Sequence, residues 1–364
     1  MARIHNFSAG PSTLPERVLR EAADELVDFH GSGLSILEMS HRSTAYQKVI
    51  DDAEATLRRV AGIPDTYRVL FFQGGATLQF AAVPLNLMRT GRAGYVVSGV
   101  FSGKAQREAE RYGTVEVLAS SEETGFTGIP DLAPVEDRMA AGGLDYLHIC
   151  QNNTIFGTMY HELPDCHGIP LVADVSSCFL SMPIDIERYG LLYAGAQKNA
   201  GPAGVTIVIV REDLVSEGPA LACCPTYLDY KKQIEAGSML NTPNTFGIYL
   251  CGKVFHWVED MGGLKAMEAR NREKASLLYD ALDRSSVFRA FAEPASRSIA
   301  NVTFRCATPE LDAAFIAGAR ERGIEGVKGH RAAGGMRASI YNAVSLESVQ
   351  ALVAYMEEFE HAQD

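Results

Sequence analysis

Apolar positions along the chain fall into two alternating patterns, short continuous runs and longer amphipathic stretches. A Thr-x-x-Glu capping box at Thr13 opens the first amphipathic stretch, whose apolar residues keep helical spacing as far as Phe29, and a second helix is predicted over 44–61. The runs that predict strands are 67–72, 94–97, 144–150, 170–173, 191–194 and 205–210. Because these runs lack strict polar alternation, we expect burial on both faces, as in a mostly parallel sheet covered by helices.

The pattern changes after residue 244. One long helix is expected to end near Gly262, a second follows it, and then come a strand at 299–304, a helix at 309–322 and a terminal helix after Ser345. Thr308 and Ser345 are the predicted N-caps, and Gly323 is the predicted stop. The fold class is therefore α/β. We expect a large domain at 16–262 with a mostly parallel, seven-stranded type of sheet, and a smaller α+β domain formed by 1–15 and 263–364.

The composition of the chain indicates a globular protein and argues against several other classes. The chain has 364 residues, and 33 Lys and Arg against 45 Asp and Glu give a formal charge of −12, which argues against a nucleic-acid partner. A content of 47% hydrophobic and 21% charged residues is that of a globular protein. No apolar run is long enough to span a membrane, and the first residues do not resemble a signal peptide. Seven scattered cysteines predict a reduced, cytoplasmic protein. We expect no metal site.

Ligands of an α/β sheet bind beyond the carboxyl ends of its strands, so the residues that follow each run are candidates for chemistry. The run 67–72 is followed by Gln73-Gly74-Gly75-Ala76-Thr77 and then by a predicted helix. Two glycines allow close approach of a ligand, and free amides at a helix start attract a phosphate. A tight strand-to-helix turn is the alternative. No nucleotide-binding fingerprint is present.

Two further strand ends carry a carboxylate and an amine. Asp174 follows the run 170–173, where it needs a cationic partner or serves as a helix N-cap. Lys198 follows the run 191–194 among small residues and is the only lysine between Lys104 and Lys231. An amine that loses hydration there favours the neutral form that reacts with an aldehyde, although a surface lysine is the common case.

Together these features match the requirements of pyridoxal phosphate. Lys198 would carry the cofactor aldehyde, Asp174 would keep the pyridine nitrogen protonated, and the glycine-rich segment would anchor the phosphate. Phe101, just after the run 94–97, would stack on the ring, although a lone aromatic is more often core.

Several longer motifs then carry a resemblance to a known family. They are Asn6 to Pro11 (NFSAGP), Met39 to Ser43 (MSHRS), 174–204 from Asp174 through Lys198, Asn241 to Phe246 (NTPNTF) and Gly329 to Asn342 (GHRAAGGMRASIYN). In sequence and order they resemble the phosphoserine aminotransferase family, within the class V pyridoxal-phosphate-dependent aminotransferases. The resemblance extends over essentially the whole chain.

This resemblance implies the aspartate aminotransferase-like fold of pyridoxal-phosphate-dependent transferases and a homodimer with its sites at the subunit interface. The reaction would exchange an amino group between glutamate and 3-phosphohydroxypyruvate in serine biosynthesis, and the same phosphate site would accept the phosphorylated hydroxythreonine of pyridoxine biosynthesis. Lys198 and Asp174 would be catalytic. The implied cofactor-binding residues are Ala76, Thr77, Phe101, Thr154, Asp174, Gln197, Lys198, Asn241 and Thr242, the last two supplied by the partner subunit. Where many members have a tryptophan on the ring, this chain has Phe101.

Substrate recognition is expected to be cationic, since both substrates carry two anionic groups. Arg337 would pair with the α-carboxylate through two parallel hydrogen bonds. His41, Arg42, His330 and Arg331 would surround the distal carboxylate or phosphate.

Other functions remain open at this point. A small-amino-acid transaminase of class V would not need a second anion site, and a cysteine desulfurase would need a mobile cysteine, which the arginine-rich motif near the carboxyl end lacks. An inert binding protein on the same fold is a third possibility. Such a protein would be expected to lose Lys198 or Asp174 first.

Overall fold

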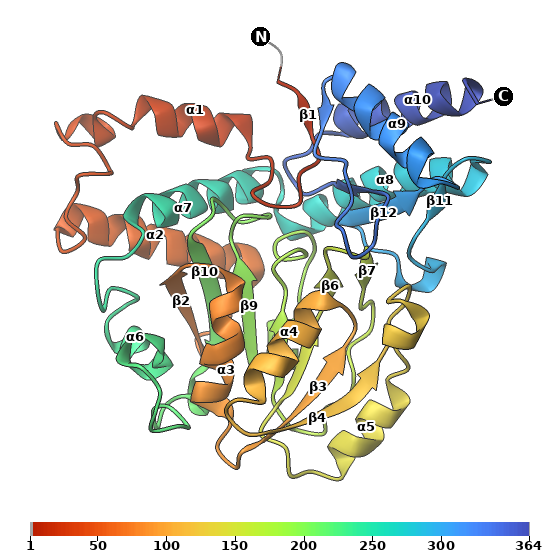
Figure 1. Ribbon diagram of the computed structural model, residues 1–364. Coiled ribbons are helices and arrows are strands. Elements are labelled where there is room, and N and C mark those ends of the chain that lie inside the picture. The colour runs from red at the N-terminus through yellow and green to blue at the C-terminus, as the bar shows by residue number, and fades with distance from the viewer. Residues whose placement is uncertain (1–2, 364) are drawn as a thin grey trace.

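The computed structural model describes residues 3–363, and a seven-stranded sheet forms its centre (Figure 1). In spatial order its strands are β2 (Tyr67–Gln73), β10 (Val205–Arg211), β9 (Leu191–Gly195), β8 (Leu171–Asp174), β5 (Leu147–Cys150), β3 (Arg92–Val97) and β4 (Thr114–Ser120). Only β10 runs antiparallel to its neighbours, and the other pairs are parallel. The predicted mostly parallel sheet is confirmed, and β4 is an edge strand that the run pattern did not reveal.

Both faces of this sheet are buried, as the continuous apolar runs predicted. Along β2, Leu70 and Phe72 belong to the core shared with α3 (Gln79–Leu87) and α4 (Val100–Ala109). The alternate residues Val69 and Phe71 belong to the opposite core, shared with α2 (Thr44–Ala61) and α7 (Thr245–Asp260). Successive side chains of a strand point to opposite faces, so a doubly covered strand must be apolar throughout. Two short helices, α5 (Ala133–Ala140) and α6 (Tyr230–Glu235), lie at the periphery.

The remainder of the chain forms a second group of elements, at the upper right of Figure 1. Its antiparallel sheet has the order β11 (Arg289–Ala290), β12 (Asn301–Arg305), β14 (Met336–Ser339), and its helices are α8 (Gly263–Arg284), α9 (Pro309–Glu321) and α10 (Leu346–His361). Strand β1 (His5–Asn6) pairs with β13 (Ile324–Glu325), so the first residues join this group. The division of the chain into domains at Gly262 stays a prediction.

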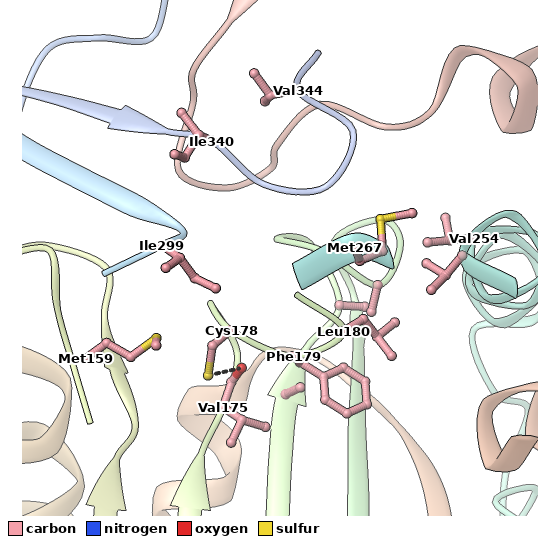
Figure 2. Packing of buried hydrophobic residues seen from close by; sticks show 14 of the residues in the cluster. Met159, Val175, Cys178, Phe179, Leu180, Val254, Met267, Ile299, Ile340 and Val344 are labelled. Carbon is pink, nitrogen blue, oxygen red and sulfur yellow. Dashed lines mark hydrogen bonds between the residues drawn. The ribbon is translucent and has the colours of Figure 1, made fainter. Parts of the chain in front are cut away.

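A shared core joins the two groups. Figure 2 shows Met267 of α8 and Val254 of α7 near Leu180, with Ile340 and Val344 from the chain after β14 in the upper part of the view. All five side chains are buried in one cluster with the core of the large sheet. This packing fixes where residues after β14 lie relative to the large sheet.

The predicted helix ends of the second group are confirmed. The Thr308 side chain accepts a hydrogen bond from the Leu311 amide at the start of α9, and Ser345 accepts one from Ser348 at the start of α10. Gly323 follows α9 with φ of 70°, a conformation that glycine adopts without steric cost.

The first predicted helix is wrong in its extent. Helix α1 covers only Glu16–Asp24, no side chain caps its start, and Thr13 instead donates a hydrogen bond to the Asn6 carbonyl. The apolar residues beyond it do not continue a buried helical face, because Leu26 and Val27 are 36% and 82% exposed. The helical spacing of these apolar residues therefore does not mark a core-facing helix, because their side chains lie on the surface of the chain.

Two findings bear on the setting of the protein. No helix within residues 3–363 combines the length and the apolar character that crossing a bilayer requires. All seven cysteines carry free thiols, and Cys223 is exposed.

Candidate active site

Lys198 lies in the turn that follows β9, at the carboxyl edge of the large sheet. Its Nζ donates a 2.6 Å hydrogen bond to Oγ1 of Thr154 and lies 5.5 Å from the centroid of the Phe101 ring. The side chain is half-buried, and burial lowers the pKa of its amine, an effect that the charge of Asp174 opposes. A lowered pKa increases the share of neutral amine, which is the nucleophilic form.

Asp174 ends β8, which lies between β5 and β9. Its carboxylate is 6% exposed and accepts hydrogen bonds from the Ser176 amide (2.9 Å) and the Ser176 hydroxyl (2.6 Å). No helix follows before Ile186–Arg188, so the alternative of a helix N-cap is wrong. Burial raises the pKa of Asp174, and the charge of Lys198 opposes that rise. A carboxylate buried this deeply is stabilised by a cation, such as a protonated ring nitrogen.

The glycine-rich segment has the geometry of an anion site. Gly74 takes φ of 100°, Gly75 precedes a turn of 3-10 helix at Ala76–Leu78, and α3 continues from there. No side chain caps the first amides of this helical turn, and a side chain at Gly75 would meet no atom within 4 Å. Uncapped amides at a helix start, reached through open space, suit a phosphate. In this segment Ala76 is half-buried and Thr77 is exposed, and their contact with a phosphate stays a prediction.

Two further residues adjoin this segment. The Gln73 side chain donates to the Thr242 carbonyl (3.0 Å) and accepts from the Asn241 amide group (3.2 Å). Asn241 and Thr242 are exposed, so they remain available to a second subunit, and their contribution to a partner's site stays a prediction. Gln197 has a buried Oε1 atom without a partner among the described residues. That orphaned acceptor leaves Gln197 with capacity for a ligand.

Arg337 on β14 reaches the Lys198 group from the second set of elements. Its Nη1 donates to the Thr154 carbonyl (3.2 Å), so both Arg337 and Lys198 contact Thr154. Burial lowers the pKa of the guanidinium, and its buried Nε has no partner within residues 3–363. A buried guanidinium with an unused donor is costly unless an anion pairs with it. The expected contact with a carboxylate fits this observation.

His330 and Arg331 lie in the turn before β14. Burial lowers the pKa of His330, and the charges of Arg337, Arg331 and Lys104 lower it further. These three cations give His330 a positive environment. Phe101, on α4, is half-buried with its ring 5.6 Å from Nζ of Lys104.

His41 and Arg42 are not joined to this group within one chain. They precede α2, whose N-cap is Ser43, and Arg42 is exposed. No hydrogen bond or ion pair in the described part of the chain connects either residue to Lys198 or Arg337. Their expected role in the site stays a prediction.

Sequence reasoning missed one wall of the site. The Ser12 hydroxyl donates to the Lys198 carbonyl, the Ser12 amide donates to the Gln197 carbonyl (3.0 Å), and a side chain at Gly10 would come within 3.4 Å of Gln197. The start of the chain thus covers the turn that carries Lys198. The only available signal was the motif at Asn6 to Pro11, which carries no chemistry of its own.

The chain is similar to known proteins over nearly its whole length. The sequence model described as Aminotransferase class-V matches residues 4–352. A phosphoserine aminotransferase of Bacillus cereus (strain ATCC 10987 / NRS 248) is 50% identical over 361 residues, which are 99% of each chain. Among solved structures, the phosphoserine aminotransferase from Bacillus circulans subsp. alkalophilus is 45% identical with a TM-score of 0.95, and covers 100% of this chain and 99% of its own. A PLP-bound phosphoserine aminotransferase from Trichomonas vaginalis is 37% identical with a TM-score of 0.89, over 98% and 100%.

Proposed function

Because the chain belongs to the class-V aminotransferase family, we propose that it transfers an amino group between L-glutamate and 3-phosphohydroxypyruvate. The products are 2-oxoglutarate and O-phospho-L-serine, and the cofactor is pyridoxal 5'-phosphate. Relatives named phosphoserine aminotransferase, about half identical over nearly the whole chain, support this reaction. The main structural support for this reaction is the position of the Lys198 amine beside Thr154 and Phe101. The buried Asp174 carboxylate lies at the end of the neighbouring strand.

The residues of the site fit the cofactor. Bound pyridoxal phosphate supplies an aldehyde that takes up amino groups and a ring that accepts the electrons released at the substrate Cα. Asp174 would keep a proton on the ring nitrogen, because a buried carboxylate favours a cationic partner. The amides of Ala76 and Thr77 bind the phosphate, together with Gln197.

The same residues position the substrate. Lys198 would hold the cofactor and, when released by substrate, would act as the base that moves the proton of the substrate Cα. Its lowered pKa keeps a neutral amine available for this transfer. Arg337 binds the α-carboxylate through its unused Nε and a neighbouring N–H. The charge near His330 and Arg331 favours a substrate with a second anionic group.

Substrate comparison tests this function. With glutamate as donor, we expect kcat/KM for 3-phosphohydroxypyruvate to exceed that for pyruvate or glyoxylate by about 10²-fold or more, because unpaired cations disfavour a neutral distal end. Measuring 2-oxoglutarate release with each acceptor checks the ratio. Equal values for the three acceptors would instead point to a small-amino-acid transaminase. Phosphorylated hydroxythreonine, tested as amino donor, shows whether the same site serves pyridoxine biosynthesis.

We further propose a homodimer with the active sites at its interface. Leu26, Val27, Leu34 and Leu37 lie between α1 and α2 and are 36%, 82%, 49% and 57% exposed. This segment projects at the left edge of Figure 1 and leads into His41. Clustered exposed apolar side chains mark interaction surfaces. Burying them against a second copy would also let His41 and Arg42 reach the partner's site.

Charge introduced into this segment is expected to break the dimer. The double variant Val27→Asp and Leu37→Asp places two carboxylates in an apolar interface and should raise the dimer dissociation constant by at least about 10²-fold. Sedimentation velocity at micromolar concentration measures the change. Val117→Asp is the matched control, since Val117 is 49% exposed on the distant edge strand β4. A double variant that sediments like the wild type would contradict this interface.

We also infer a cytoplasmic location from the free thiols and no nucleic-acid partner from the charge of −12.

A further inference from the structure

Lys274 of α8 is a buried cation that the proposed reaction does not use. Its side chain is 3% exposed. Its Nζ donates hydrogen bonds to three backbone carbonyls, those of Ile340 (2.9 Å), Tyr341 (2.7 Å) and Val344 (3.0 Å). No carboxylate pairs with it within residues 3–363.

The three carbonyls match the three donors of an ammonium group. A buried ammonium without a counterion is costly, and burial lowers the pKa of Lys274. A neutral amine has only two N–H groups, so it would leave one carbonyl unpaired. The charged form pairs all three carbonyls and so favours one conformation of residues 340–344, which we term the 340–344 turn.

The 340–344 turn connects directly to the turn that carries Lys198. The backbone amide of Asn342 donates to Oδ1 of Asn199, the residue after Lys198 (2.9 Å). The Asn342 side chain donates to the Leu180 carbonyl (2.8 Å) and accepts from Asn271 of α8 (2.8 Å). Asn199 is 7% exposed, so this link lies away from solvent.

The same turn follows the strand that carries Arg337. Strand β14 ends at Ser339, and Ile340 begins the segment that Lys274 binds. The Tyr341 hydroxyl donates to the Ala9 carbonyl (2.9 Å), which ties the turn to the chain segment over Lys198. Ile340 and Val344 are themselves buried in the shared core, and Figure 2 shows both on the chain after β14.

We propose that Lys274 is a positioning residue for the transamination: by fixing the 340–344 turn, its ammonium sets Arg337 relative to Lys198. This inference rests on the proposed function, since it concerns the two residues that hold the substrate carboxylate and move the substrate proton. The loss of its three hydrogen bonds frees the turn and with it the Asn342–Asn199 link. Misplacement of catalytic groups by about 1 Å costs up to about 10²-fold in rate.

Two variants test the proposal in the cofactor-loaded protein. Lys274→Met removes all three donors, and Asn199→Ala removes the side-chain acceptor that links the turn to the Lys198 segment but leaves Lys274 in place. Both should raise KM for glutamate and phosphoserine by about tenfold or more. Both should also shift the midpoint pH of the bound cofactor's visible absorbance, which reports the surroundings of Lys198 without any substrate.

Tyr355→Phe is the matched control. Its hydroxyl donates to the Phe315 carbonyl in a buried contact between α10 and α9, away from Lys198. It should lower thermal stability without changing KM or the absorbance midpoint.

The possible results of these measurements either support or overturn the role of Lys274. Wild-type KM and midpoint in Lys274→Met, or equal changes in Tyr355→Phe, would overturn the proposal. If Lys274→Met does not fold, Asn199→Ala decides: unchanged values overturn the proposal, because the link to the Lys198 segment is then without effect, and shifted values support it. Failure of the proposed function is distinguishable, because it appears in the wild type as no phosphoserine turnover, whereas the absorbance titration needs no substrate.

Discussion

Lys198→Ala is expected to abolish transamination, lowering kcat by at least about 10⁴-fold. General acid–base transfer alone contributes up to about that factor, and covalent attachment of the cofactor is lost as well. No other lysine contacts Thr154 within the described residues, so no nearby amine replaces it. Steady-state turnover of phosphoserine with 2-oxoglutarate measures the loss.

Two controls make this result specific to the amine. Lys231→Ala removes a half-buried lysine of α6, far from the carboxyl edge of the sheet, and should retain wild-type kcat. A small primary amine added to Lys198→Ala should restore part of the turnover, because it supplies the missing base. Substantial turnover in Lys198→Ala without added amine would refute the role of Lys198.

Asp174→Asn is expected to lower kcat/KM by about 10²- to 10³-fold, the usual effect of removing a preorganised electrostatic group. The amide keeps an oxygen acceptor for Ser176 but cannot hold a proton on the ring nitrogen. Asp174→Glu keeps the charge and should be less impaired. Kinetics with phosphoserine over a range of concentrations separates the two variants. Equal activity of Asp174→Asn and the wild type would remove Asp174 from the reaction.

The same substitution should have the opposite effect on the stability of the protein without cofactor. Burial raises the pKa of Asp174 above its unfolded value, so the folded state binds more protons than the unfolded state between the two values. The free energy of unfolding therefore falls as pH rises from about 4 through the folded pKa. Asp174→Asn should lack this loss and be the more stable protein at pH 7. Urea unfolding of both proteins at pH 5 and pH 7 measures the difference.

The strand ends were the most predictable part of the site. Asp174 and Lys198 follow apolar runs, and the carboxyl ends of parallel strands meet at one edge, so local sequence was enough to bring them together. The burial of the sheet on both faces was also predictable, because its apolar runs lack alternating polar residues. The edge strand β4 escaped because its exposed and half-buried residues lack such a run.

Contacts between distant segments could not be predicted from local pattern. Arg337 and Thr154 are 183 positions apart, and Ser12 and Lys198 are 186 apart. Only the family resemblance proposed a role for Arg337, and nothing in the sequence singled out Lys274. The helix predicted to extend to Phe29 failed because apolar spacing does not tell a core face from a surface that a second subunit can cover.

Trapping the cofactor by reduction identifies the lysine that carries it. The protein is loaded with pyridoxal phosphate, reduced with borohydride, digested with trypsin and examined by mass spectrometry. Modified Lys198 resists cleavage, so we expect the phosphopyridoxyl group on the single peptide 189–211 and none in Lys198→Ala. A label on another lysine, or an unlabelled 189–211 region after reduction, would contradict the account.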